Sequence, residues 1–127
     1  MNGRAAGELA RLTLTEREGV VRAAVDGELD VSNVGEFEAR LHALPNAALG
    51  LILDLSTTTF MDSSAVSLIH GLRERLRRRG QLLRVVAAAG SAPRRVLELT
   101  GYEHAGPLDD GEAGAEVAIR AAAAGPG

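Results

Sequence analysis

The chain has 127 residues, enough for one domain with a single modest core. Apolar residues make up 46% of it but aromatic residues only 2%, so the core must consist mainly of Leu, Val, Ile and Ala. The formal net charge of -3 gives no general attraction to nucleic acid or to an anionic membrane. With Cys at 0, a disulfide framework, a thiolate metal site and a cysteine nucleophile are excluded.

Two observations bear on location and domain organisation. No apolar run approaches the length that spans a bilayer, and the N-terminus lacks the apolar segment of a signal peptide. We therefore expect a cytoplasmic protein that does not contact a membrane. Residues 1–9 predict a flexible N-terminal arm, and residues 10–124 predict a single domain without an interdomain linker.

The first half of the chain predicts a β-hairpin followed by a helix. Apolar and polar residues alternate over 12–14 and 21–25, which is typical of two antiparallel strands joined by a short turn. Ser32 or Asn33 can cap the helix that follows, and Asn33 and Glu36 have the spacing of a capping box. The apolar face of this helix consists of Val34, Phe37, Leu41 and Leu44.

The second half predicts a strand–helix–strand unit and two further helices. The apolar runs at 51–53 and 82–86 are typical of strands buried on both faces. A helix over 64–79 joins them, so the two strands should be parallel with a right-handed crossover. Further helices are expected after Ser91 and after 109–110. The fold class is therefore α/β, with a mixed sheet and helices mostly on one side.

The segment from Leu51 to Val66 contains the strongest functional signal. It ends with Asp62, Ser63 and Ser64 at the start of the central helix. Side-chain oxygens at this place accept from the free N–H groups of the first helical turn, and the helix dipole favours negative charge. Two interpretations remain open from these residues alone: helix capping, or a displayed hydroxyl at a position that accommodates an attached phosphate.

The run over 53–66, LDLSTTTFMDSSAV, resembles the signature of the STAS domain. This family includes bacterial anti-sigma factor antagonists and the cytoplasmic tails of sulfate transporters. Residues 27–30, GELD, resemble the family's segment before the first helix, and residues 94–101, RRVLELTG, resemble its late helix. The resemblance implies a single STAS-like domain with a mixed sheet of about four to five strands, backed by about four helices.

The resemblance also implies roles for five residues. Antagonist members are phosphorylated on the second serine of the Asp-Ser-Ser run, which is Ser64 here. Ala65 stands where Gly is usual, and its small side chain leaves the turn accessible to a docked partner. Asp62 would orient the hydroxyl or contact the kinase in addition to capping, and Ser63 would be a structural hydrogen-bond donor. Asp30 would lie near the same edge, either as a solvated loop acid or as part of the interface.

The function implied by the resemblance is that of an anti-sigma factor antagonist acting by partner switching. The unphosphorylated protein would bind an anti-sigma factor serine kinase and thereby free the sigma factor for transcription. Phosphorylation of Ser64 would end this complex, and a serine phosphatase would restore the starting state. The alternative is a STAS scaffold or interaction module without a phosphate cycle, in a signalling assembly or a transporter system.

Other chemistry is not supported by the sequence, and we expect neither an enzyme nor a cofactor. A triad of Ser64, His70 and Asp62 would lack a Gly-x-Ser-x-Gly turn, and His70 lies on the same helix as the serine. The other histidines show no metal-ligand spacing, and phosphate-binding glycine loops are absent. The arginines over 73–79 lie at a helix C-terminus without interleaved aromatics, so direct nucleic-acid binding is not expected.

Overall fold

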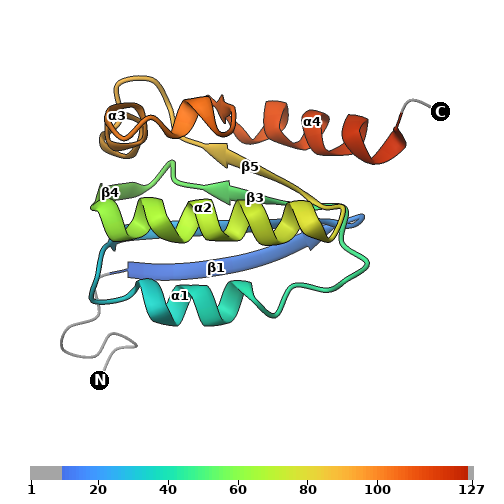
Figure 1. Ribbon diagram of the computed structural model, residues 1–127, viewed down its shortest axis with the longest axis horizontal. Coiled ribbons are helices and arrows are strands. Elements are labelled where there is room, and N and C mark those ends of the chain that lie inside the picture. Colours follow the sequence, from blue (N-terminus) through green and yellow to red (C-terminus); the bar gives the residue numbers. More distant parts are fainter. Residues whose placement is uncertain (1–9, 126–127) are drawn as a thin grey trace.

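A mixed six-stranded sheet forms the centre of the computed structural model, which describes residues 10–125 (Figure 1). The predicted arm over 1–9 lies outside the described residues. The elements in chain order are β1 (Ala10–Arg17), β2 (Val20–Leu29), α1 (Val34–Leu41), β3 (Gly50–Asp54), β4 (Thr58–Met61), α2 (Ser63–Arg78), β5 (Leu82–Val86), α3 (Ala92–Leu99), the 3-10 helix η1 (Tyr102–His104), β6 (Leu108–Asp109) and α4 (Glu112–Ala124).

The predicted hairpin is confirmed. β1 and β2 are antiparallel and their register ends with Arg17 opposite Val20, so only Glu18 and Gly19 form the turn. Both turn residues have positive φ, 50° and 88°, as a two-residue turn that matches the twist of the strands requires. β1 forms one edge of the sheet, whose strand order is β1-β2-β3-β5-β6.

The predicted strand–helix–strand unit is also confirmed. β3 and β5 are parallel neighbours, and α2 connects them. The sheet nevertheless has more strands than the resemblance implied, because two short ones were missed. β4, with four residues, pairs in parallel with the second half of β2, where a polar loop was expected. β6, with two residues, extends the sheet beyond β5.

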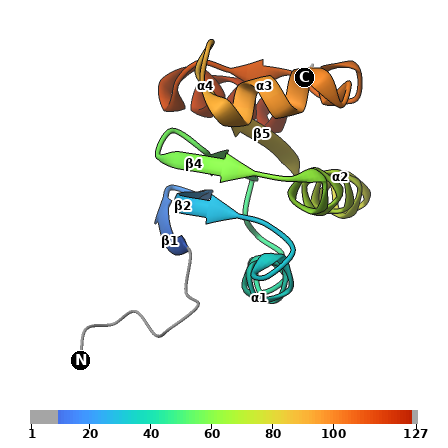
Figure 2. The same ribbon diagram turned by 90° about the vertical axis from the view of Figure 1, so that its left-hand side faces the viewer.

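Helices cover the two faces of the sheet unequally (Figures 1 and 2). The larger apolar cluster includes buried side chains of α1, α2 and α3, such as Phe37, Ile69 and Leu97. The opposite face has a small cluster, in which Ala115 and Ile119 of α4 are fully buried against β2, β3 and β5. The expectation of helices mostly on one side is therefore correct, with α4 as the exception.

Local features of the sequence mark the start of α3 and the end of α2. The side chain of Ser91 accepts from the main-chain N–H of Arg94 at 3.2 Å and so caps α3. Gly80 follows α2 with a φ of 74°, a conformation that favours glycine. No helix within residues 10–125 is long and apolar enough to cross a membrane.

Candidate functional site

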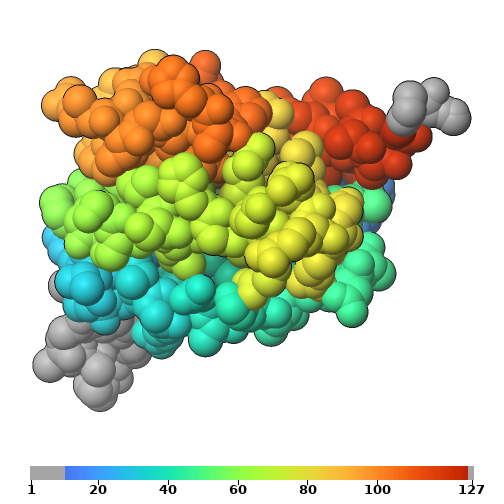
Figure 3. All heavy atoms as spheres, viewed as in Figure 1, coloured from blue at the N-terminus to red at the C-terminus, as the bar shows by residue number. Residues whose placement is uncertain are grey.

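The three residues of the Asp-Ser-Ser run lie where β4 ends and α2 begins. Asp62 is the N-cap of α2, and its own main-chain N–H donates to Leu29 O, at the end of β2. The start of α2 is thus at the carboxyl ends of two parallel strands, beside the β2–α1 loop. Figure 3 shows this end of α2, in green, at the molecular surface next to the light-blue segment that includes the loop.

The carboxylate of Asp62 holds this region together. Its Oδ1 accepts from the main-chain N–H of Ser64 at 3.0 Å and of Ala65 at 3.3 Å, and also from the hydroxyl of Ser64. Its Oδ2 accepts from the main-chain N–H of Val31 at 3.2 Å. One side chain therefore caps α2, orients the half-buried Ser64 hydroxyl and ties the β2–α1 loop to the helix.

These hydrogen bonds favour the ionised form of the Asp62 carboxyl. The bond from the Ser64 hydroxyl is the largest cause that lowers the pKa of the Asp62 carboxyl below its usual value, and the three N–H donors act in the same direction. Both Asp62 and the start of the helix are accessible to solvent. A group attached to Ser64 would therefore meet a fixed negative charge on one side and the positive end of the helix dipole on the other.

Asp30 lies near the same edge, as the sequence predicted. Its Oδ1 accepts from the main-chain N–H of Ser32 at 2.9 Å and from the Ser32 hydroxyl at 2.5 Å. Asp30 therefore stabilises its own loop, and it does not bond directly to Asp62 or Ser64 within the described residues. Its place in a partner interface stays a prediction.

The capping box predicted for α1 is wrong. Asn33 occupies the N-cap position but makes no side-chain cap bond. Its Oδ1 instead accepts from the main-chain N–H of Asp30 at 3.0 Å, and its Nδ2 donates to Glu28 O at 2.8 Å. The side chain bonds back into the β2–α1 loop, since local main-chain groups compete with the helix for an Asn side chain.

The structure adds the hydrogen bonding and burial of Ser63 and Ala65, whose place in a partner interface stays a prediction. Ser63 is exposed, and within residues 10–125 its hydroxyl donates to no other residue, so the structural donor role expected of it is not found there. Ala65 is 0% exposed, and its methyl group belongs to the large apolar cluster. The side chain of Ala65 packs into the core because it faces the same side of α2 as Ile69 and Leu72.

An exposed apolar residue beside the site was missed by the sequence reasoning. Val31 is 75% exposed, although its main-chain N–H is bound by Asp62. Phe60, on β4, is 48% exposed and lies two residues before Asp62. The signal for Val31 was an apolar residue between the polar Asp30 and Ser32, which the sequence analysis treated only as loop.

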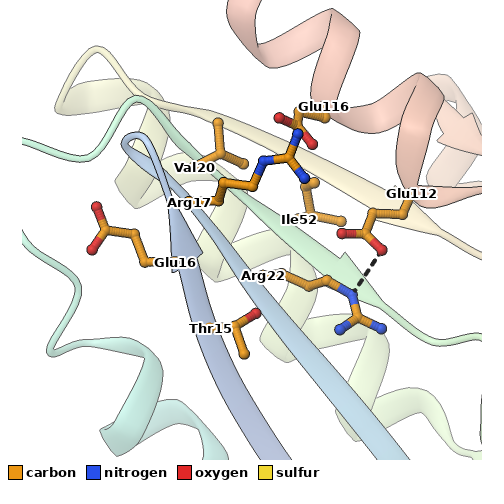
Figure 4. A pocket seen from close by; sticks show the side chains of 8 residues that line it. All are labelled: Thr15, Glu16, Arg17, Val20, Arg22, Ile52, Glu112 and Glu116. Atoms are coloured by element: carbon orange, nitrogen blue, oxygen red, sulfur yellow. Dashed lines mark ion pairs between the residues drawn. The ribbon is translucent and has the colours of Figure 1, made fainter.

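A hollow lies on the α4 face of the sheet. It has a volume of about 230 Å3 and is bounded by β1, β2 and α4 (Figure 4). In it the Arg22 guanidinium is 2.6 Å from Asp54 Oδ2 and 3.3 Å from Glu112 Oε1, so it links the hairpin to β3 and α4. None of the five predicted site residues lines this hollow, and within residues 10–125 no cluster of metal-binding side chains exists.

One family model matches most of the chain. The model of the STAS domain matches residues 11–115. The chain belongs to the STAS domain family. The match includes both the β2–α1 loop and the Asp-Ser-Ser run, so the residues that carry the resemblance are the residues that Asp62 joins in this STAS domain.

Solved structures give the same fold. An anti-sigma factor antagonist from Mycobacterium paratuberculosis is 28% identical, with a TM-score of 0.80 over 87% of this chain and 94% of that one. The Bacillus cell fate determinant SpoIIAA in its phosphorylated form is 24% identical, with a TM-score of 0.63 over 86% and 99%. A sulfate transporter family protein from Wolinella succinogenes is 15% identical, with a TM-score of 0.71 over 85% and 90%. The comparison with curated protein sequences found no match.

Proposed function

We propose that this STAS domain is an anti-sigma factor antagonist that works by partner switching. The observation that carries the proposal is the Ser64 hydroxyl, which lies at the accessible start of α2 and is oriented by Asp62. The likeness to the antagonist from Mycobacterium paratuberculosis supports it. In this proposal the protein is a cytoplasmic binding protein without catalytic activity, cofactor or direct contact with nucleic acid or membrane.

The partner would be an anti-sigma factor serine kinase, which binds the unphosphorylated protein. The contact surface would combine Asp62, Ser63 and Ser64 with the loop around Asp30, and we add the exposed Val31 to it. The main chain of Ala65 belongs to the same turn. Binding would release the sigma factor, and transfer of phosphate to Ser64 would then separate the two proteins until a serine phosphatase removes the phosphate.

The effect of phosphorylation on the fold should be small. A phosphoserine carries about -1.5 to -2 charges at neutral pH. The first turn of α2 would stabilise an exposed anion by roughly 0.3–1 kcal/mol, and repulsion by the Asp62 carboxylate opposes this gain. Phosphorylated and unphosphorylated protein should therefore have nearly the same stability.

The effect on the interface should be large. The surface of the partner would fit a neutral hydroxyl, so phosphorylation would bury an unpaired charge there. Such a charge costs on the order of 2–5 kcal/mol, which weakens binding at least tenfold. The proposed switch thus acts through local electrostatics at Ser64 and needs no refolding.

The test compares Ser64→Asp and Ser64→Ala with wild type. Each protein is used to capture partners from a lysate of its own organism, and the captured proteins are identified by mass spectrometry. We expect wild type and Ser64→Ala to retain a kinase-type anti-sigma factor and Ser64→Asp to lose it, while all three melt within a few degrees of each other. Ser67→Asp, an exposed position one turn further along α2, is the matched control and should retain the partner.

A second outcome distinguishes the alternative function. The likeness to a sulfate transporter family protein makes a scaffold role without a phosphate cycle the second candidate. In that case wild type, Ser64→Asp and Ser64→Ala would retain the same partners, and the purified partner with ATP would leave Ser64 unmodified. Phosphate on Ser63 or Ser56, with none on Ser64, would contradict the assignment of the phosphorylated residue.

A further inference from the structure

The outer edge of β1 is a second surface with binding potential. β1 has eight residues and pairs with β2 in an uninterrupted register from Ala10 to Arg17. No other strand within residues 10–125 pairs with its outer edge. Proteins usually protect such edges with bulges, prolines, short strands, charged side chains or a covering helix or loop. β1 has no bulge or proline and is not short, so its outer edge can accept a strand whose charges match those of Arg11, Glu16 and Arg17.

The hairpin fixes which main-chain groups face outward. Since Arg17 and Val20 flank a two-residue turn, the N–H and C=O groups of Arg17, and of every second residue before it, bond to β2. Those of Leu12, Leu14 and Glu16 therefore face away from β2. A contact of α1 is consistent with this orientation: Nη1 of Arg40 donates to Leu12 O at 3.1 Å, so this C=O does not need a partner in β2.

An apolar hollow accompanies this edge on the α1 side of the sheet. Its volume is about 230 Å3, and it is lined by Leu14, Val21, Leu44 and Pro45 together with the side chains of Arg40 and Glu16. Leu14 is 38% exposed there. Leu14 therefore lies at the middle of the free edge, with the cation of Arg40 near Leu12 on one side and the anion of Glu16 on the other.

We propose that this edge binds a second copy of the chain, with the two β1 strands antiparallel and Leu14 opposite Leu14. This pairing places Leu12 of each copy opposite Glu16 of the other, and it exchanges about six main-chain hydrogen bonds. The N–H of the second copy's Glu16 takes the place of Arg40 on Leu12 O. The guanidinium then pairs with the carboxylate of that same Glu16.

The charges favour a second copy in this register over other occupants. Arg40 and Glu16 lie on the same side of the sheet, and in the single copy Glu16 Oε2 accepts from the main-chain N–H of Gly19 at 3.3 Å. A two-fold axis at Leu14 adds two Arg40–Glu16 ion pairs, one on each side of the axis. On the other side the same register brings Arg11 near Arg17 of the second copy, and Asp26, the cross-strand neighbour of Arg11, offsets this repulsion. Shifting the register by two residues would place Glu16 opposite Ala10 in one direction and opposite Leu14 in the other, so in both cases Glu16 would move away from Leu12 and Arg40. The surface shares no residue with the Ser64 site.

The test is a charge-reversal cycle measured by sedimentation velocity up to about 200 µM, a range suited to a small, transient interface. Wild type should dimerise with increasing concentration, and Arg40→Glu and Glu16→Arg should each weaken dimerisation at least tenfold. The double variant should restore it. Arg95→Glu, an exposed arginine on α3, is the matched control and should dimerise like wild type.

Further measurements keep the test decisive. Circular dichroism establishes whether each variant is folded. If Arg40→Glu or Glu16→Arg does not fold, Arg40→Gln or Glu16→Gln replaces it. Each of these should dimerise more weakly than wild type. A wild-type monomer at the highest concentration, or single reversals that dimerise like wild type, would refute the proposal. So would a monomer in which the amides of Leu12, Leu14 and Glu16 are protected from hydrogen exchange, because another part of the chain would then cover the edge.

Discussion

Replacing Asp62 with alanine is the most direct test of how the site is held together. The change removes a carboxylate that accepts from Ser64 and Ala65 in the first turn of α2 and from Val31 in the β2–α1 loop. It leaves Ser64 in place with an unoriented hydroxyl. Both the stability of the domain and the order of the loop should therefore change.

The magnitude follows from the contacts that are lost. Replacing an Asp N-cap with Ala costs about 0.5–2 kcal/mol, and the lost bond to Val31 adds to this cost because it is charge-assisted. We expect the free energy of unfolding to fall by about 2 kcal/mol. For a domain of this size the melting temperature should fall by roughly 6–10 °C.

The assay is thermal and urea unfolding of wild type and Asp62→Ala at several pH values. The folded-state pKa of Asp62 is lowered, so the part of its contribution that depends on ionisation is fully present above the unfolded pKa of about 3.9 and is lost as pH falls through the folded-state pKa. The difference between the two proteins should be largest near pH 7 and should narrow below about pH 4.

Two controls separate capping from charge. Asp62→Asn can still cap the helix and should lose less stability than Asp62→Ala at pH 7. Ser91→Ala removes the hydroxyl that accepts from the main-chain N–H of Arg94. Because this cap carries no charge, the loss in free energy of unfolding should be nearly the same at pH 4 and at pH 7. Equal stability of Asp62→Ala and wild type at pH 7, or a difference that grows in acid, would refute this account of Asp62.

Three further predictions concern two glycines and the buried tyrosine. Gly50→Ala would place a Cβ 2.5 Å from Leu82 O and 2.9 Å from Ile119 Cγ2, so urea unfolding should show a loss of about 1–3 kcal/mol. Gly71→Ala, in α2 with nothing within 4 Å, should instead stabilise by up to about 1 kcal/mol, and a loss there would contradict this view of the free space. Tyr102 is the single tyrosine, and burial raises its pKa to about 12, so its absorbance should titrate near that value. Because the folded state disfavours the phenolate, stability should fall above about pH 10, and a midpoint near 10 in folded protein would show that Tyr102 is accessible.

Much of the fold was determined by local sequence patterns. The alternation in β1 and β2, the apolar runs of β3 and β5 and the helical period of α2 each extend over enough residues to define an element. The position of Asp62 at the start of α2 was likewise readable, because its capping bonds are to Ser64 and Ala65 in the next turn. The crossover between β3 and β5 followed from the handedness of such connections.

The tertiary structure decided the features that depend on distant partners. β4 and β6 are strands only because β2 and β5 lie beside them, and segments of four and two residues are too short to show a period. The Asn33 side chain bonds to Glu28 and Asp30 in the β2–α1 loop instead of capping its own helix. The bond between Asp62 and Val31 joins residues far apart in the chain, and the register of β2 with β4 brings them together. Sequence patterns report local periodicity, whereas these contacts depend on which elements lie side by side.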